Sequence, residues 1–189
     1  MRDLAWISAR LDAAPAAALR GTLTRLVPFV PVTKNRPVDW LFTTGRPNRY
    51  NPAGTECVYF AEDEATARAE YDQYWAGLPG AAQPLVTYFA EVQLRRVLDL
   101  TSKDSLKALG VRPSELFTNW RRAKRPTVTQ LIGQAVNTTC KFSAIRYPSN
   151  ATRDAGFPGT NIVIFRTRIQ RPDFVHILGP TKKPLQKWP

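Results

Sequence analysis

The chain has 189 residues, 43% of them hydrophobic, with five Trp, six Tyr and nine Phe, which predicts a folded globular protein of one domain and excludes a disordered chain. Its 27 Lys and Arg against 15 Asp and Glu give a net charge of +12, which suits a nucleic acid, an anionic dinucleotide or an acidic protein partner. No apolar run approaches the ~20 residues of a membrane span and the N-terminus lacks a signal peptide, so we expect a cytoplasmic protein in which Cys57 and Cys140 are reduced.

The N-terminal part of the chain predicts a helical segment followed by a strand. Residues 2–12 have apolar side chains at helical spacing, and we expect residues 16–20 to add a further helical turn. The run 22–30 predicts a strand, in which Arg25 lies between two leucines. A helical segment over residues 1–20 is therefore expected to precede the main domain.

One stretch in the first half of the chain combines three kinds of signal. The loop Gly45–Gly54 is rich in Arg, Asn, Pro and Gly, which form turns and provide donors for anionic ligands. The apolar run Cys57–Ala61 predicts a buried strand. Asp63 is then suited to cap a helix over Glu64–Ala76, which Gly77 is expected to end.

Glu70 differs from the other carboxylates of this helix because it has no basic neighbour. Glu64 and Asp72 each lie four residues from Arg68, whereas the residues three and four positions from Glu70 are uncharged. On a helical wheel Glu70 lies at the edge of the apolar face, beside Tyr74. This position is typical of a half-solvated surface glutamate, or of a carboxylate held at the edge of a cleft for catalysis.

The second half of the chain predicts mixed strands and helices. The predicted segments are a strand over 85–94 that continues extended to 100, a short helix that Thr101 or Ser102 caps and that ends at Gly110, helices over 113–124 and 128–137, strands over 142–147 and 161–169, and a loop over 148–159. The tail, residues 170–189, is basic and rich in proline and is expected to wrap the surface. Strands and helices do not alternate regularly, which argues against a doubly wound parallel sheet.

The chain lacks the motifs of the common cofactor and metal sites. It has neither the Gly-rich loop of dinucleotide-binding folds nor a GK[ST] phosphate loop. A single histidine, His176, and two scattered cysteines do not make the usual zinc ligand sets, so no metal is expected. The lone histidine also removes the Ser–His and Cys–His nucleophile pairs unless the tail folds back. Arg, Tyr, Glu and Ser remain as the available reactive groups.

An ordered set of motifs resembles the RES-domain family, which is named for its Arg, Glu and Ser. The matching segments are Arg49-Tyr50-Asn51 with Gly54, Val58–Ala61, Thr66-Ala67 with Glu70, Asp99–Thr101, Thr129-Gln130 and Tyr147–Ser149. The resemblance implies a single compact α+β domain related to the ADP-ribosyltransferase fold, with a split β core, flanking helices and a cleft for NAD. Residues 21–169 would form this catalytic domain.

Cleavage of the bond between nicotinamide and ribose in NAD suits the available groups, since the leaving group is neutral and positive charge develops on the ribose. The resemblance implies that Glu70 stabilises this charge and that Ser149 bonds the ribose or the nicotinamide amide. Arg25 and Arg49 would bind the pyrophosphate, and Tyr59 would stack on a flat ring with its hydroxyl free to bond. Each residue also has a purely structural alternative, in a strand, a turn or the core.

The leading functional hypothesis is an NAD-degrading toxin of a bacterial toxin–antitoxin pair, which cleaves NAD by hydrolysis or phosphorolysis. Its expected partner is a cognate antitoxin, of the Xre helix-turn-helix type, that occludes the cleft; no membrane partner is expected. One alternative is a mono-ADP-ribosyltransferase that modifies a protein, because the acceptor site need contain no diagnostic residue. The other is a basic nucleic-acid-binding module, for which only the cluster Arg121–Arg125 argues.

Overall fold

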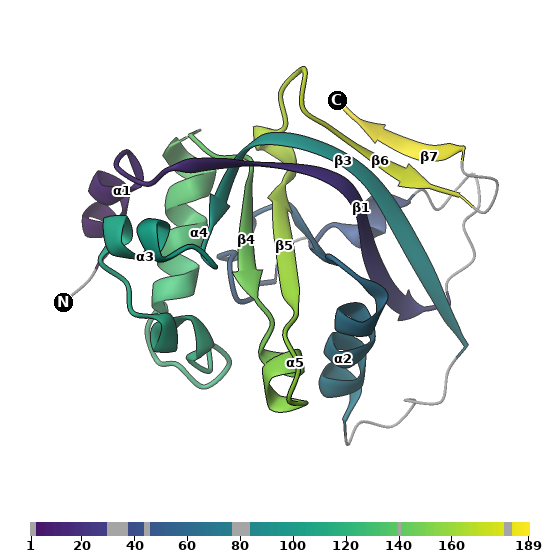
Figure 1. Ribbon diagram of the computed structural model, residues 1–189, viewed down its shortest axis with the longest axis horizontal. Helices are drawn as coiled ribbons and strands as arrows, with labels where there is room; N and C mark the ends of the chain where they lie inside the picture. The colour runs from purple at the N-terminus through teal and green to yellow at the C-terminus, as the bar shows by residue number, and fades with distance from the viewer. Residues whose placement is uncertain (1–2, 30–37, 44–45, 77–83, 140, 180–182) are drawn as a thin grey trace.

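The computed structural model describes residues 3–29, 38–43, 46–76, 84–139, 141–179 and 183–189 (Figure 1). The helices are α1 (Leu4–Leu11), α2 (Glu64–Trp75), α3 (Lys103–Leu109), α4 (Val128–Thr139) and α5 (Asn150–Asp154), with 3-10 turns at Val38–Leu41, Pro113–Phe117 and Arg166–Arg168. The strands are β1 (Ala16–Pro28), β2 (Cys57–Ala61), β3 (Leu85–Asp99), β4 (Ala144–Pro148), β5 (Thr160–Phe165), β6 (Phe174–Leu178) and β7 (Pro184–Trp188). None of the helices in the described ranges has the length and apolarity needed to cross a bilayer.

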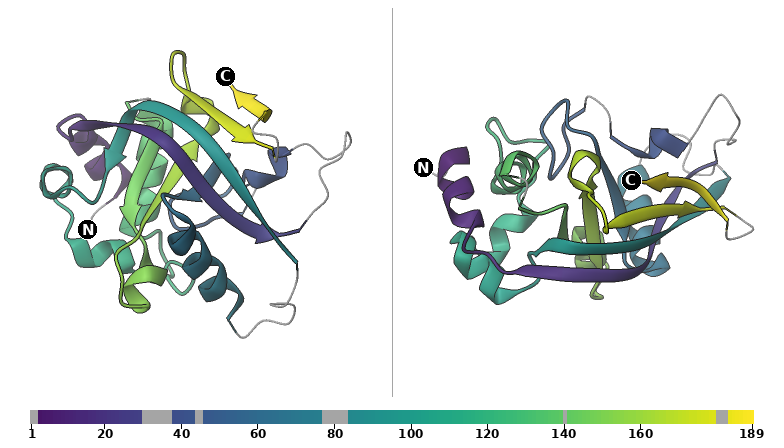
Figure 2. Two further views of the ribbon diagram at one scale, coloured as in Figure 1. Left: turned by 45° about the vertical axis from the view of Figure 1, so that its right-hand side comes forward. Right: turned by 90° about the horizontal axis from the view of Figure 1, so that it is seen from above.

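The strands form one mixed sheet that is split between β1 and β2. Its order is β1-β2-β5-β4-β3-β6-β7, and β1 pairs with β3 as well. The long strands β1 and β3 run side by side and curve past the shorter strands β4 and β5 (Figure 2). In the described residues β1 pairs with β2 only through Thr24 and Ala61, whereas it follows β3 along almost its whole length. The α+β fold with a split β core is thereby confirmed.

Strand β5 separates two buried clusters, because its side chains alternate between the faces of the sheet. Val163 and Phe165 face the cluster that α1, α3 and α4 cover. Ile162 and Ile164 face a second cluster, which β1, β3 and β6 enclose from the other side. Both faces are buried, which explains why this strand is a continuous apolar run.

The helix ends confirm the capping residues that the sequence predicts. Asp63 precedes α2, and its Oδ1 accepts a hydrogen bond from the backbone N of Thr66 at 2.7 Å. Ser102 caps α3 in the same manner, and Gly110 ends α3 in the left-handed conformation with a φ of 61°. These signals depend on residues within one turn of each other.

The expectation of a helical turn at residues 16–20 is wrong, because this segment is the start of β1. Ala16 pairs with Leu98 and Ala17 with Val97, so the alanine-rich segment extends a strand that β3 holds along its length. Pairing with a distant strand here outweighs the helix propensity of alanine. The predicted domain division at residue 20 lies inside β1, and the division itself stays a prediction.

The predicted helix over 113–124 is also wrong, since only the 3-10 turn Pro113–Phe117 forms. Beyond it, the side chain of Asn119 accepts a hydrogen bond from the backbone N of Arg121 at 3.1 Å. Such local bonds of asparagine compete with helix formation. The segment therefore crosses the surface as a turn, with its basic residues exposed.

The tail does not simply wrap the surface, because residues 174–178 and 184–188 form β6 and β7. β6 adds to β3, and its Val175 and Ile177 are buried with the period of a strand. The predicted loop 148–159 contains α5, and the strand expected over 161–169 ends at Phe165. The expectations for Gly77 and Cys140 lie outside the described residues, whereas Cys57 is a buried free thiol.

Candidate functional site

A cleft of about 790 Å³ opens where the sheet is split. Its walls are the end of β1, the end of β2, one side of α2 and the segments around Asn48 and Trp120. Of the five site residues expected from the sequence, Arg25, Arg49, Tyr59 and Glu70 line the cleft. The fifth residue, Ser149, contacts Glu70. The fold therefore brings together residues that are up to 124 positions apart in the chain (149 minus 25).

Two buried side chains hold the carboxylate of Glu70. Its Oε1 accepts a hydrogen bond from Ser149 Oγ at 2.7 Å and one from Asn161 Nδ2 at 2.5 Å. Ser149 is 2% exposed and Asn161 is 5% exposed. Ser149 Oγ also accepts from the backbone N of Thr152, so its proton is directed to Glu70. The other carboxylate oxygen, Oε2, has no hydrogen-bond partner in the described part of the chain, which leaves it available to a ligand.

Asn161 is the residue at this site that the sequence interpretation missed. It is the second residue of β5, where it precedes four apolar residues. A buried polar side chain at the start of such a run requires a partner, and this requirement is the signal that was present in the sequence. The partner is Glu70, 91 residues away, which periodicity does not identify.

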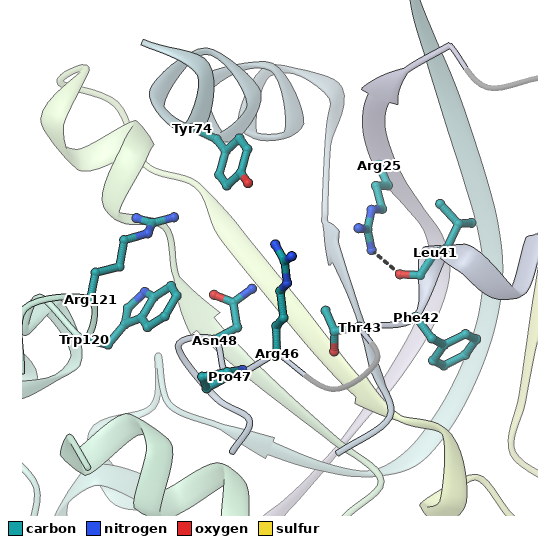
Figure 3. Close-up of a pocket in the computed structure, with 10 residues that line it drawn as sticks. All are labelled: Arg25, Leu41, Phe42, Thr43, Arg46, Pro47, Asn48, Tyr74, Trp120 and Arg121. Carbon is teal, nitrogen blue, oxygen red and sulfur yellow. Dashed lines mark hydrogen bonds between the residues drawn. The ribbon is translucent and has the colours of Figure 1, made fainter. Parts of the chain in front are cut away.

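Arg25 lies at the point where β1 and β2 separate. Its Nη1 donates to the backbone O of Leu41 at 2.8 Å and to that of Tyr59 at 3.2 Å; Figure 3 shows the first of these bonds. Burial lowers the pKa of Arg25 to about 10. Among the described residues no carboxylate forms an ion pair with it. A desolvated cation of this kind favours an anionic ligand.

Tyr59 differs from the expectation in one respect, because its hydroxyl is not free. The hydroxyl donates to Asn51 Oδ1 at 2.8 Å and accepts from the backbone N of Tyr50 at 3.1 Å. The Arg-Tyr-Asn segment folds back onto β2, and Tyr59 fixes this fold. Burial raises the pKa of Tyr59 well above its usual value. The ring lines the cleft as a neutral phenol, and the segment that it holds carries Arg49.

One hydrogen bond from the backbone and one from the side chain orient Arg49. Its backbone N donates to Asn48 Oδ1 and its Nη1 donates to the backbone O of Leu116, each at 2.8 Å. The remaining guanidinium donors are available at the wall of the cleft. Close by, burial and then the charge of Glu70 raise the pKa of Tyr147, whose side chain also lines the cleft.

Positive charge dominates the cleft and the smaller pocket beside it. The charged side chains in their described walls are five arginines and one carboxylate: Arg25, Arg46, Arg49, Arg121, Arg153 and Glu70. Part of the net charge of +12 is thus concentrated around a single carboxylate, an arrangement that attracts anions. No group of three His, Cys, Asp or Glu residues suited to a metal is found within the described ranges.

Comparisons with known proteins bear on this arrangement. The family model described as the RES domain matches residues 33–184. A chain in the crystal structure of the M. tuberculosis MbcT–MbcA toxin–antitoxin complex is similar with a TM-score of 0.58 and 18% identity, over 88% of this chain and 86% of that one. No curated protein matches the chain. At this level of identity the structural likeness concerns the fold.

Proposed function

The chain belongs to the RES-domain family, and from this premise we propose that it is a cytoplasmic toxin that cleaves the bond between nicotinamide and ribose in NAD. The observation that carries the proposal is the carboxylate of Glu70, which two buried donors orient within an arginine-lined cleft. The similarity to a chain of a toxin–antitoxin complex supports the assignment as a toxin.

The reaction needs few groups from the protein. When the bond between the ribose carbon and the nicotinamide nitrogen breaks, the electron pair leaves with a neutral nicotinamide, so no strong acid is required. Positive charge develops on the ribose, as in glycoside hydrolysis, and the carboxylate of Glu70 stabilises it. Oε2 can accept a hydrogen bond from a ribose hydroxyl while Ser149 and Asn161 hold Oε1. An oxygen of water or phosphate then bonds the ribose carbon, and the proton that this oxygen loses passes to solvent.

The arginines of the cleft suit the two negative charges of the pyrophosphate. Arg25 is the strongest candidate, because it is desolvated and pairs with two carbonyls instead of a carboxylate. Arg49 provides a second guanidinium, whose position the bond to Leu116 fixes. The ring of Tyr59 also lines the cleft, where it can contact a flat ring.

The function is tested by incubating the protein with NAD, with and without phosphate, and identifying the products. Nicotinamide with ADP-ribose indicates hydrolysis, and nicotinamide with phosphorylated ADP-ribose indicates phosphorolysis. Labelled protein in a lysate indicates a mono-ADP-ribosyltransferase instead. Absence of turnover contradicts the proposal and directs attention to nucleic-acid binding by the basic segment Arg121–Arg125.

Arg49→Lys is expected to weaken NAD binding although it keeps the positive charge. A lysine cannot grip a phosphate with two parallel hydrogen bonds, and it also loses the bond to Leu116. We expect the KM for NAD to rise by about tenfold. Arg20→Lys, the same change at an exposed position of β1 outside the cleft, is the matched control. An unchanged KM in the Arg49 variant would indicate that this arginine contributes charge alone, and Arg46 would become the better candidate.

We further propose that a cognate antitoxin of the Xre type restrains the protein by covering the arginine-lined cleft. An acidic segment near Arg25, Arg49 or Arg153 would exclude NAD, and association should slow as salt rises because charges steer it. The test uses the Glu70→Gln protein, which should turn NAD over slowly, in complex with its antitoxin and with NAD as competitor. If NAD does not release the antitoxin at concentrations that saturate the free protein, inhibition is conformational and occlusion is wrong.

A further inference from the structure

A second pocket adjoins the Glu70 cleft, and Phe42 and Asn48 are among the residues that line it. Figure 3 shows these lining residues. Its volume is about 380 Å³, and it shares several wall residues with the cleft, among them Arg25, so the two spaces are neighbours. Of the residues assigned above to NAD cleavage, only Arg25 lines it. The second pocket therefore extends the site beyond the reacting bond.

The charges of this pocket suit a phosphate group. Arg25, Arg46 and Arg121 line it, and no carboxylate does so among the described residues. Arg46 and Arg121 form no ion pair with any carboxylate in the ranges that the structure describes. Their side chains extend into the same space (Figure 3). Guanidinium groups that converge without counter-charges repel one another, and a bound anion removes this repulsion.

The aromatic residues of the pocket suit a flat ring. The guanidinium of Arg121 lies 4.8 Å from the ring centre of Trp120 and 5.8 Å from that of Tyr74, which belongs to α2. Tyr74 is 58% exposed, so much of its ring is accessible to a ligand. A planar guanidinium and a nucleobase bind aromatic faces in the same way, so a base could take the place of the Arg121 guanidinium at these rings and release it to bind the phosphate.

We propose that this pocket binds the adenosine monophosphate half of the dinucleotide, with the base against Trp120 and Tyr74 and its phosphate at Arg46 and Arg121. The proposal rests on the proposed function, since Glu70 lies one helical turn before Tyr74 and Arg25 lines both spaces, where the pyrophosphate would connect them. Asn48 Oδ1 accepts from the backbone of Arg49, so the amide N–H groups of Asn48 remain for the ring nitrogens of the base.

The first test compares NAD with nicotinamide mononucleotide, which has the same reacting bond but lacks the adenosine monophosphate half. Trp120→Ala is expected to raise the KM for NAD by about tenfold or more, with kcat unchanged and the KM for the mononucleotide raised less than about twofold. Trp120→Phe keeps a flat ring and should restore most of the affinity. Phe29→Ala removes an exposed aromatic side chain outside both spaces and is the control. If Trp120→Ala raises the KM equally for both substrates, or raises the KM for neither of them, the proposal is wrong.

The second test measures binding of adenosine monophosphate by calorimetry and does not depend on turnover. The wild type should bind it more tightly than inorganic phosphate, and Trp120→Ala should weaken the binding by about tenfold. If adenosine monophosphate binds no better than phosphate, or binds both proteins equally, the pocket is not a base site, even where NAD is cleaved. If Trp120→Ala weakens the binding of adenosine monophosphate but the wild type does not cleave NAD, the pocket assignment stands and the proposed function fails.

Discussion

Replacing Glu70 with glutamine is expected to reduce NAD turnover by about 10²–10³-fold while the protein stays folded. The amide oxygen of glutamine can still accept the hydrogen bonds from Ser149 and Asn161, so the side chain keeps its position. The change removes the negative charge to which the proposed function assigns stabilisation of the ribose in the transition state. Most of the effect should appear in kcat, because the charge acts mainly on the transition state, and loss of the acceptor at Oε2 should add a smaller rise in KM.

The matched control is Glu64→Gln, which makes the same chemical change in the first turn of the same helix. Glu64 is exposed and does not line the cleft, so turnover should stay at the wild-type level. Thermal unfolding of both variants shows that the comparison is made between folded proteins. A folded Glu70→Gln protein with near-wild-type turnover would refute the assignment of this carboxylate.

Gly133→Ala is expected to lower the free energy of unfolding by about 3 kcal/mol. Gly133 lies in α4, and a Cβ added there would be 1.6 Å from the backbone O of Tyr50 and 2.5 Å from its carbonyl carbon. Neither atom can move without moving the backbone between Arg49 and Asn51. Alanine favours a helix by about 1 kcal/mol over glycine, so destabilisation would show that the clash outweighs propensity.

Chemical denaturation measures this effect, with Gln134→Ala as the control at the next position of α4. The control gains helix propensity without a close contact and should be as stable as the wild type. A reduced midpoint at constant slope identifies a loss of stability. If Gly133→Ala is as stable as the wild type, α4 does not need to approach the Arg49 segment this closely. If Gly133→Ala is as stable as the wild type but has a raised KM for NAD, the added methyl group distorts the cleft and not the fold.

The sequence was sufficient for features that depend on neighbouring residues. Strand β2 occupies the predicted residues, and the caps at Asp63, Ser102 and Gly110 lie where the side chains indicated. These features could be predicted because a cap or an apolar period acts over a few positions. Glu70 could be singled out for the same reason, since its lack of a basic neighbour is a local property of α2.

The tertiary structure alone decided what depends on distant pairing. Residues 16–20 became a strand because β3 is their partner, and the tail became β6 for the same reason. The donors that hold Glu70 come from 79 and 91 positions along the chain, and the hydroxyl of Tyr59 is used because a neighbouring segment folds back onto it. Local propensities differ by about 1 kcal/mol or less per residue, which a ladder of backbone hydrogen bonds or a buried polar contact outweighs. The sequence thus determined which side chains are available for chemistry, and closure of the chain around the split sheet determined which of them meet.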